Sequence, residues 1–180
     1  KSICDKYNLY LIEDCAQAHF AEYNSQKVGT FGIVGTFSFY PGKNLGAYGD
    51  AGAIITNDDQ LAIKMKMFAN HGALQKHQHE IEGVNSRMDG LQAAILSVKL
   101  KYIDEWNQKR YQNALIYNEK LRDVKGVLVP KIRAASSHIF HLYVMRTKRR
   151  NELQEYLKRQ GVETAIHYPS ALPFLRAYNY

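Results

Sequence analysis

Short apolar runs in the first third of the chain predict the strands of one sheet. Polar or turn-forming residues follow each run, which is typical of buried strands in an α/β sheet. The second run is aromatic and stops at Pro41-Gly42, a pair that ends strands. The predicted strands are residues 9–12, 37–40 and 53–56.

Apolar residues at three- and four-residue spacing predict helices between and after these strands. Asn8 is expected to be the C-cap of the first helix. Asn57 is expected to cap the second, because Gln60 can reach back to its amide. Helices that lead into buried strands predict an α/β fold. The predicted helices are residues 2–7, 57–69, 88–103, 104–121 and 151–160.

The pattern changes after Lys125-Gly126, where short strands surround one amphipathic helix. These strands are predicted at residues 127–130, 138–145 and 162–166, and they indicate a small α+β domain. We therefore expect three parts, namely the end of a large domain (residues 1–103), a linking helix (104–125) and the start of a small domain (126–180). The polar segment 70–86 is interpreted as a surface loop that can cross to another subunit.

Composition narrows the classes of protein. The chain of 180 residues is 46% hydrophobic, yet it contains no apolar run long enough to cross a bilayer. Cys4 and Cys15 provide neither a disulfide framework nor metal-ligand spacing, so reduced thiols in the cytoplasm are expected. His77 and His79 lack a clustered third ligand and are interpreted as exposed loop residues. We expect neither a metal nor a membrane partner.

The formal net charge of +7 raises the question of nucleic-acid binding. The basic residues are spread along the chain, and the densest run, residues 146–150, opens a predicted helix. Such a run is usually a solvated helix face, so no nucleic-acid partner is expected. A basic surface can also attract a nucleotide diphosphate.

Side chains with useful chemistry lie in or after the predicted strands. Asp14 follows the first strand, Ser38 lies in the second, and Lys43 follows the turn after it. Open α/β sheets bind ligands at the carboxyl ends of their strands. By position alone, Lys43 can equally be a surface lysine, Asp14 a helix cap and Ser38 a core hydroxyl.

Three motifs carry a resemblance to a known family. They are EDCAQAH at residues 13–19, FSFYPGKNLG at 37–46 and GVNSRMD at 83–89. In this order they resemble the DegT/DnrJ/EryC1/StrS family of pyridoxal-phosphate-dependent sugar aminotransferases. The resemblance implies the aspartate-aminotransferase fold, with a mixed, mostly parallel sheet and a small α+β domain. Family members are longer, so this chain is expected to lack most of the phosphate-binding cradle and the aromatic residue that stacks on the cofactor.

The resemblance also implies roles for five residues. Lys43 corresponds to the Schiff-base lysine that binds pyridoxal phosphate and moves the α-proton, a role that requires a deprotonated amine. Asp14 corresponds to the partner of the pyridine nitrogen, Gln17 to that of the ring oxygen, and Ser38 to a phosphate ligand. Asn85 corresponds to an asparagine that reaches the phosphate of the neighbouring subunit, so a homodimer with a shared active site is expected.

The activity implied by the resemblance is amino transfer from an amino acid, glutamate in the family, to a keto group of a nucleotide-linked deoxy sugar. Gln17 and the segment 85–106 look most like members that aminate C3, in polysaccharide or antibiotic sugar biosynthesis. Two alternatives stay open: a non-catalytic binding or regulatory protein with the same fold, and a dehydratase, against which Lys43 argues. Phe20 departs from the family, which usually has glycine there, so the local backbone or sugar pocket is expected to differ.

Overall fold

The computed structural model describes all residues from Lys1 to Tyr180. Contacts along the chain divide it into two units, one formed by Lys1–Ala114 with Ile132–His141 and the other by Leu115–Lys131 with Leu142–Tyr180. The division falls inside the long helix α4 (Ile103–Leu121). The domain bounds expected from the sequence stay a prediction.

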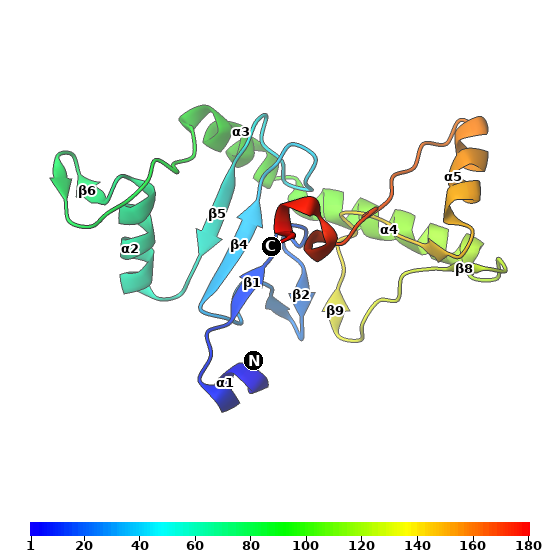
Figure 1. The fold of residues 1–180 in the computed structure, drawn as a ribbon, viewed down its shortest axis with the longest axis horizontal. Helices are drawn as coiled ribbons and strands as arrows, with labels where there is room; N and C mark the ends of the chain where they lie inside the picture. The colour runs from blue at the N-terminus through cyan, green and yellow to red at the C-terminus, as the bar shows by residue number, and fades with distance from the viewer. The chain divides into compact units, whose positions relative to one another are not determined.

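A three-stranded mixed sheet forms the centre of the first unit (Figure 1). Its strands are β1 (Ile12–Asp14), β4 (Val34–Ser38) and β5 (Gly52–Ile55), in the order β1-β4-β5. β1 runs parallel to β4, with Asp14 opposite Thr36, and β5 runs antiparallel, with Gly52 opposite Ser38. The α/β prediction is confirmed, and all three strands exist.

The strand bounds differ from those predicted because backbone pairing, not apolarity, defines them. β1 starts at Ile12 rather than residue 9, since its pairing with β4 starts with Ile12 opposite Val34. β4 starts three residues earlier than predicted and includes Gly35. A Cβ at that position would lie 2.4 Å from the Cα of Gly29. The glycines therefore allow two backbones to touch.

Helices agree well with the apolar periodicity. Helix α1 (Ser2–Tyr7) ends at Asn8, whose φ of 51° is left-handed, as predicted for a C-cap. Helix α2 (Asp59–Ala69) is capped by Asp58 rather than Asn57, because the Asp58 carboxylate accepts the Leu61 amide hydrogen bond at 3.0 Å. Helices α3 (Gly90–Leu100) and α4 lie within the predicted ranges or close to them.

Very short strands were not predicted from the sequence. A second sheet has the order β3-β2-β9, and a separate hairpin, β6-β7, lies within the segment interpreted as an irregular loop. Strands of two or three residues cannot show an alternating pattern, so periodicity misses them. These strands are β2 (Glu22–Tyr23), β3 (Gln26–Lys27), β6 (Ala73–Gln75), β7 (Gln78–His79) and β9 (Ser136–Ser137).

The predicted strand at residues 138–145 is wrong. The segment pairs with no neighbouring strand, although Ile139 and Phe140 are both buried. Phe140 also has a φ of 42°, and its amide donates to the His138 ring nitrogen Nδ1 at 3.0 Å. The segment is therefore a turn that places two apolar side chains in the interior.

The second unit contains a small antiparallel pair and one regular helix. The pair is β8 (Val127–Leu128) with β10 (Arg146–Thr147), and helix α5 (Arg150–Arg159) lies within one residue of the prediction. The predicted strand at 162–166 is wrong, since the Thr164 carbonyl pairs with the side chain of Gln154 instead of a neighbouring strand. Two 3₁₀ turns, η1 (Leu172–Phe174) and η2 (Arg176–Tyr178), follow.

The buried apolar cluster of the first unit lies beside the loop that follows β4. Leu45 and Ala47 of this loop pack with Leu96 of α3 and Ile103 of α4. Burying a leucine side chain stabilises a fold by about 2 kcal/mol, so the cluster fixes the loop against both helices. Partly buried residues packed against the cluster are Phe39, Ala51, Met88 and Trp106.

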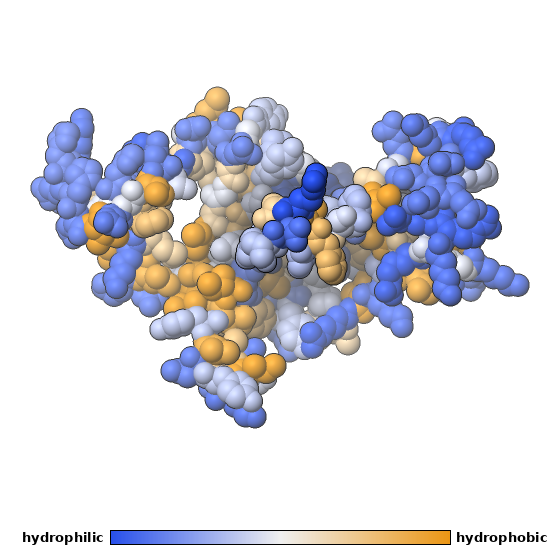
Figure 2. Space-filling model, viewed as in Figure 1, coloured by the Kyte–Doolittle hydropathy of each residue, from blue (hydrophilic) through white to orange (hydrophobic).

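The surface is unevenly hydrophobic. Figure 2 shows hydrophobic residues exposed over the sheet of the first unit and mainly hydrophilic residues over α5. Exposed apolar side chains of the sheet include Ile12 and Ile54. None of the helices combines the length and apolar character that crossing a membrane would need.

Candidate active site

Two neighbouring carboxylates at the end of β1 have different surroundings. The Glu13 carboxylate accepts hydrogen bonds from the backbone amides of Gly29, Phe31 and Gly32, each at 2.7 Å. Asp14 points to the other face of the strand and is exposed, and it accepts only the local Ala16 amide at 3.0 Å. Glu13 therefore anchors a loop, while the Asp14 carboxylate is exposed at the end of the strand.

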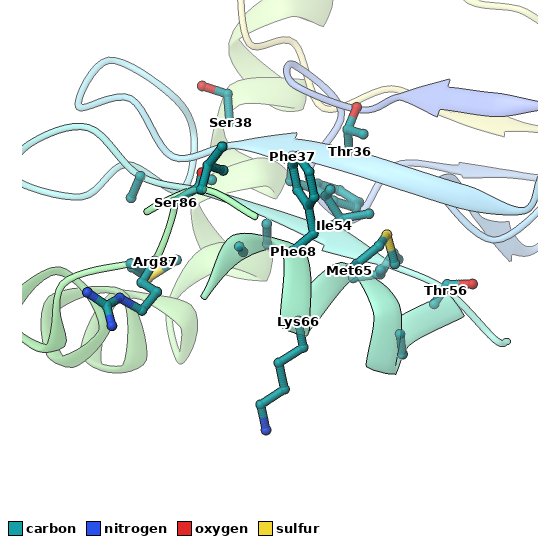
Figure 3. A pocket seen from close by; sticks show the side chains of 18 of the residues that line it. Thr36, Phe37, Ser38, Ile54, Thr56, Met65, Lys66, Phe68, Ser86 and Arg87 are labelled. Atoms are coloured by element: carbon teal, nitrogen blue, oxygen red, sulfur yellow. The ribbon is translucent and has the colours of Figure 1, made fainter. Parts of the chain in front are cut away.

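Ser38 ends the strand beside β1, so it lies at the same edge of the parallel pair as Asp14. Its hydroxyl accepts the Tyr40 amide at 3.3 Å, and its carbonyl pairs with Nε2 of His19 at 2.9 Å. Figure 3 shows Ser38 and Thr36 on one side of the sheet and Phe37 on the other, toward Phe68.

Lys43 lies in the loop after β4 and is half-buried. Its amide donates to the Tyr40 carbonyl at 2.9 Å, which closes a turn after the strand. Gly46 completes this loop, since a Cβ there would lie 2.4 Å from the Pro41 carbonyl oxygen. The Lys43 ammonium forms no ion pair with any acid of the chain.

Helix α3 holds the far end of the same loop. Lys99 donates to the Gly46 carbonyl, and the side-chain oxygen of Gln92 accepts the Tyr48 amide at 2.8 Å. Together with the burial of Leu45 and Ala47, these bonds fix the backbone on the carboxyl side of Lys43.

His19 is a buried histidine next to these groups, although the sequence suggested no role for it. Its ring lies 5.7 Å from Phe37 and 5.8 Å from Phe39. Burial lowers the pKa of His19, the Ser38 hydrogen bond opposes this effect, and the positive charge of Lys43 lowers the pKa further. The ring is therefore neutral at pH 7, with Nε2 donating to Ser38 and Nδ1 lacking a hydrogen-bond partner.

Cys15 is not a nucleophile in this setting. Burial raises the pKa of its thiol to about 11, and the negative charges of Glu13 and Asp14 contribute. Only a thiolate reacts readily, so the interpretation of Cys15 as a buried, unpaired thiol agrees with the structure.

Gln17 and Asn85 are both exposed. Gln17 lies in a turn closed by the Ala18 amide and the Cys15 carbonyl at 3.0 Å, rather than in a helix. Asn85 pairs with Asn70 through an isolated bridge, and no hydrogen bond joins it to Asp14, Ser38 or Lys43 of its own chain. Asp14, Ser38 and Lys43 thus lie at or after the carboxyl ends of β1 and β4, Gln17 follows Asp14 in the next turn, and Asn85 lies in another segment of the chain.

The first unit also contains a hollow. It has a volume of about 1330 Å³ and lies between α2 and the face of β4 and β5 (Figure 3). Phe37, Ile54 and Phe68 make it mainly apolar. Of the five predicted site residues, Ser38 lines this groove, whereas Asp14 and Lys43 do not, so the groove is distinct from the surroundings of the lysine.

Comparisons with known proteins agree on one family. The profile of the DegT/DnrJ/EryC1/StrS aminotransferase family matches residues 1–180. The erythromycin biosynthesis sensory transduction protein EryC1 of Saccharopolyspora erythraea is 43% identical over 178 residues, covering 99% of this chain and 49% of that protein. The dTDP-3-amino-3,6-dideoxy-alpha-D-galactopyranose transaminase of Aneurinibacillus thermoaerophilus is 48% identical over 167 residues, covering 93% and 46%.

Solved structures are similar as well. S. venezuelae DesV, crystallised in complex with a ketimine intermediate, matches with a TM-score of 0.97 and 40% identity, covering 99% of this chain and 48% of DesV. The chain spans about half the length of the curated relatives it matches.

Proposed function

Because the chain belongs to the DegT/DnrJ/EryC1/StrS aminotransferase family along its whole length, we propose that its protein transfers an amino group from an amino acid to a keto group of a nucleotide-linked sugar. The observation that carries this proposal is the arrangement of Asp14, Ser38 and Lys43 along one edge of β1 and β4. A carboxylate, a hydroxyl and an amine at the carboxyl ends of strands suit a charged cofactor there.

The residues present fit pyridoxal 5'-phosphate. The Lys43 amine has no competing acid, and the Asp14 carboxylate is exposed at the strand edge. Lys43 would bind the cofactor's aldehyde carbon, Asp14 its ring nitrogen and Gln17 its ring oxygen, while Ser38 would bind its phosphate. Pyridoxal phosphate, when bound, supplies a ring that withdraws electrons from the carbon next to the reacting amine.

Asp14 and Lys43 would have different roles in proton transfer. Asp14 would keep a proton on the ring nitrogen of the bound cofactor, because a carboxylate stabilises the positive charge there. Nζ of Lys43 would accept the α-proton of the amino donor and pass it to the cofactor in the first half of the reaction, and it would deliver a proton to the sugar carbon that becomes aminated in the second half.

We assign glutamate as the amino donor and C3 of a deoxy sugar as the aminated carbon. Gln17 and the segment 85–106 support this choice, as does the similarity to a transaminase whose name specifies a 3-amino sugar. The net charge of +7 favours the approach of a nucleotide diphosphate. Two unpaired cysteines suit a reducing cytoplasm.

Trapping the cofactor on the natural, full-length protein tests the activity. After incubation with pyridoxal phosphate and reduction with borohydride, we expect a pyridoxyl group on the peptide that contains Lys43. Lys43→Arg keeps the charge and should abolish the adduct. A folded protein with no adduct, or with one on another lysine, would overturn the proposal.

A regulatory protein is the second candidate, because the relative from Saccharopolyspora erythraea is named for sensory transduction. A protein of that kind would keep the fold without turnover. Bound pyridoxal phosphate gives visible absorption, and keto-sugar turnover in its presence distinguishes the aminotransferase from a non-catalytic binder.

We further propose a homodimer in which Asn85 serves the partner's site. Its exposure and its separation from Lys43 within one chain support this assignment. Co-expression of Lys43→Ala and Asn85→Ala chains tests it. Each heterodimer would hold one intact site, so an equal mixture should recover about a quarter of the wild-type activity. No recovery above the two parent variants would show that Asn85 does not act across subunits.

A further inference from the structure

Asn107 is a buried amide on α4, and neither the resemblance nor the proposed chemistry gives it a role. We propose that Asn107 is a positioning residue that holds Lys43 in its reacting orientation. It does so by bonding to Asn44, the residue after Lys43, and to His19, which contacts the end of β4 before Lys43. This inference rests on the proposed function only in taking Lys43 as the reacting amine.

The side chain of Asn107 bonds to two segments that lie far apart in the sequence. Its Nδ2 donates to the carbonyl oxygen of His19 at 3.0 Å, and its Oδ1 accepts from Nδ2 of Asn44 at 2.8 Å. Asn44 is the residue after Lys43. His19 in turn pairs with the Ser38 carbonyl at the end of β4. One amide therefore fixes the position of the lysine relative to the end of the strand.

Asn44 has further partners, which determine how both amides are oriented. Its Nδ2 also donates to the Ile139 carbonyl at 3.3 Å, and its Oδ1 lies 3.1 Å from Nδ1 of His141. An amide oxygen only accepts, so His141 donates from Nδ1. Turning the Asn107 amide over would face NH₂ with NH₂ and oxygen with oxygen. The network thus has one orientation, and Asn44 has a single position in it.

The loop after β4 is also constrained by apolar contacts at the residues that follow Asn44. Leu45 and Ala47 are buried against α3 and α4, but apolar contacts alone tolerate small shifts along the chain. The directional bonds from Asn44 remove that freedom at the residue next to Lys43. A misplacement of about 1 Å in a reacting group costs on the order of 100-fold in rate, so a positioning effect is measurable.

Two substitutions separate the bonds of Asn107 from its volume. Asn107→Leu has a similar size and removes both hydrogen bonds. Asn107→Asp keeps the acceptor for Asn44 but faces the His19 carbonyl with a second oxygen. The matched control is Asn118→Leu on the same helix, where the side-chain oxygen of Asn118 accepts the Tyr143 hydroxyl at 2.7 Å in the second unit.

The first readout needs neither cofactor nor turnover. Natural, full-length protein is freed of cofactor, the folded fraction is collected, and lysines are labelled with trace acetic anhydride. The reactivity of Lys43 is read by mass spectrometry relative to exposed Lys101. A freed loop exposes its amine more often, so both Asn107 variants should raise this ratio on the order of fivefold. Asn118→Leu should leave the ratio at the wild-type value.

The second readout compares kcat with KM for the enzyme with its cofactor bound. We expect kcat of both Asn107 variants to fall about 100-fold while KM for the amino donor changes less than about threefold. The proposal is overturned if the folded Asn107 variants show the same ratio of Lys43 to Lys101 labelling as the wild type. This holds even if the melting temperatures of the variants fall. Should Asn107→Leu not fold, Asn107→Asp gives the same decision. Absence of a pyridoxyl adduct in wild type would instead overturn the proposed function and leave the labelling result valid.

Discussion

At the residue scale, Phe20 shows what the departure from glycine means. Its φ is 65°, in the left-handed region that side chains with a Cβ rarely adopt. A glycine, which the family resemblance predicts at this position, would fit this backbone without strain. Lys27 compensates in part, since its ammonium lies 5.5 Å from the centre of the Phe20 ring.

We expect Phe20→Gly to be more stable than Phe20→Ala by roughly 1 kcal/mol. Both remove the ring and its contact with Lys27, but alanine keeps the cost of a positive φ. Urea unfolding of the two variants in the natural protein measures the difference directly. Equal stability, or a more stable alanine variant, would mean that the turn relaxes to an ordinary conformation once the ring is gone.

The sequence drew attention to Asp14 and Lys43, because an acid and an amine follow predicted strands, but their roles were assigned only from the motifs around them. His19 and Asn107 did not stand out. Their importance comes from partners far along the chain, namely the carbonyl of Ser38 for His19 and the side chain of Asn44 for Asn107. Only folding reveals which buried polar groups satisfy each other.

At the scale of elements, the long periodic helices and the α/β class could be predicted, and the short strands could not. Helices α3 and α4 carry enough apolar positions to define a period. The two-residue strands β2 and β3 depend instead on Asn24 and Ser25, both at positive φ, which form the turn between them. Pairing partners and turn conformations are tertiary information, so a single sequence reports them poorly.

The loop from residue 28 to 32 is another element shaped by one side chain. Glu13 accepts three backbone amides from it, so a carboxylate inside the fold replaces the strand partner that this loop lacks. Of the acid pair at the end of β1, Glu13 thus has a structural function and Asp14 is left for the proposed chemical one, and the sequence motif could not separate them.

At the scale of the whole molecule, two desolvated histidine rings make stability depend on pH. Desolvation lowers the pKa of buried His19 and that of His138, a residue that is otherwise exposed, below the ordinary value of 6.5. The unfolded chain therefore takes up these protons at a higher pH than the folded chain does. Their contribution to stability is complete above pH 6.5 and is lost as the pH falls below it.

We expect the free energy of unfolding to decrease when the pH is lowered from 7 to 5, and His19→Gln to weaken this dependence. Glutamine can still donate to the Ser38 carbonyl but does not titrate. Urea midpoints measured at several pH values, for wild type and variant, check the slope. Parallel curves for the two proteins would show that His19 does not contribute to it.

The bond between Asn44 and the Ile139 carbonyl joins positions 95 residues apart. Contacts of such long range form late, because the chain must first close a large loop. On a ribosome, the segment around Lys43 would emerge well before Ile139 is synthesised. An unfinished chain would therefore not hold its lysine in the reacting geometry, and the amine becomes competent only once the polypeptide extends past His141 and folds back on itself.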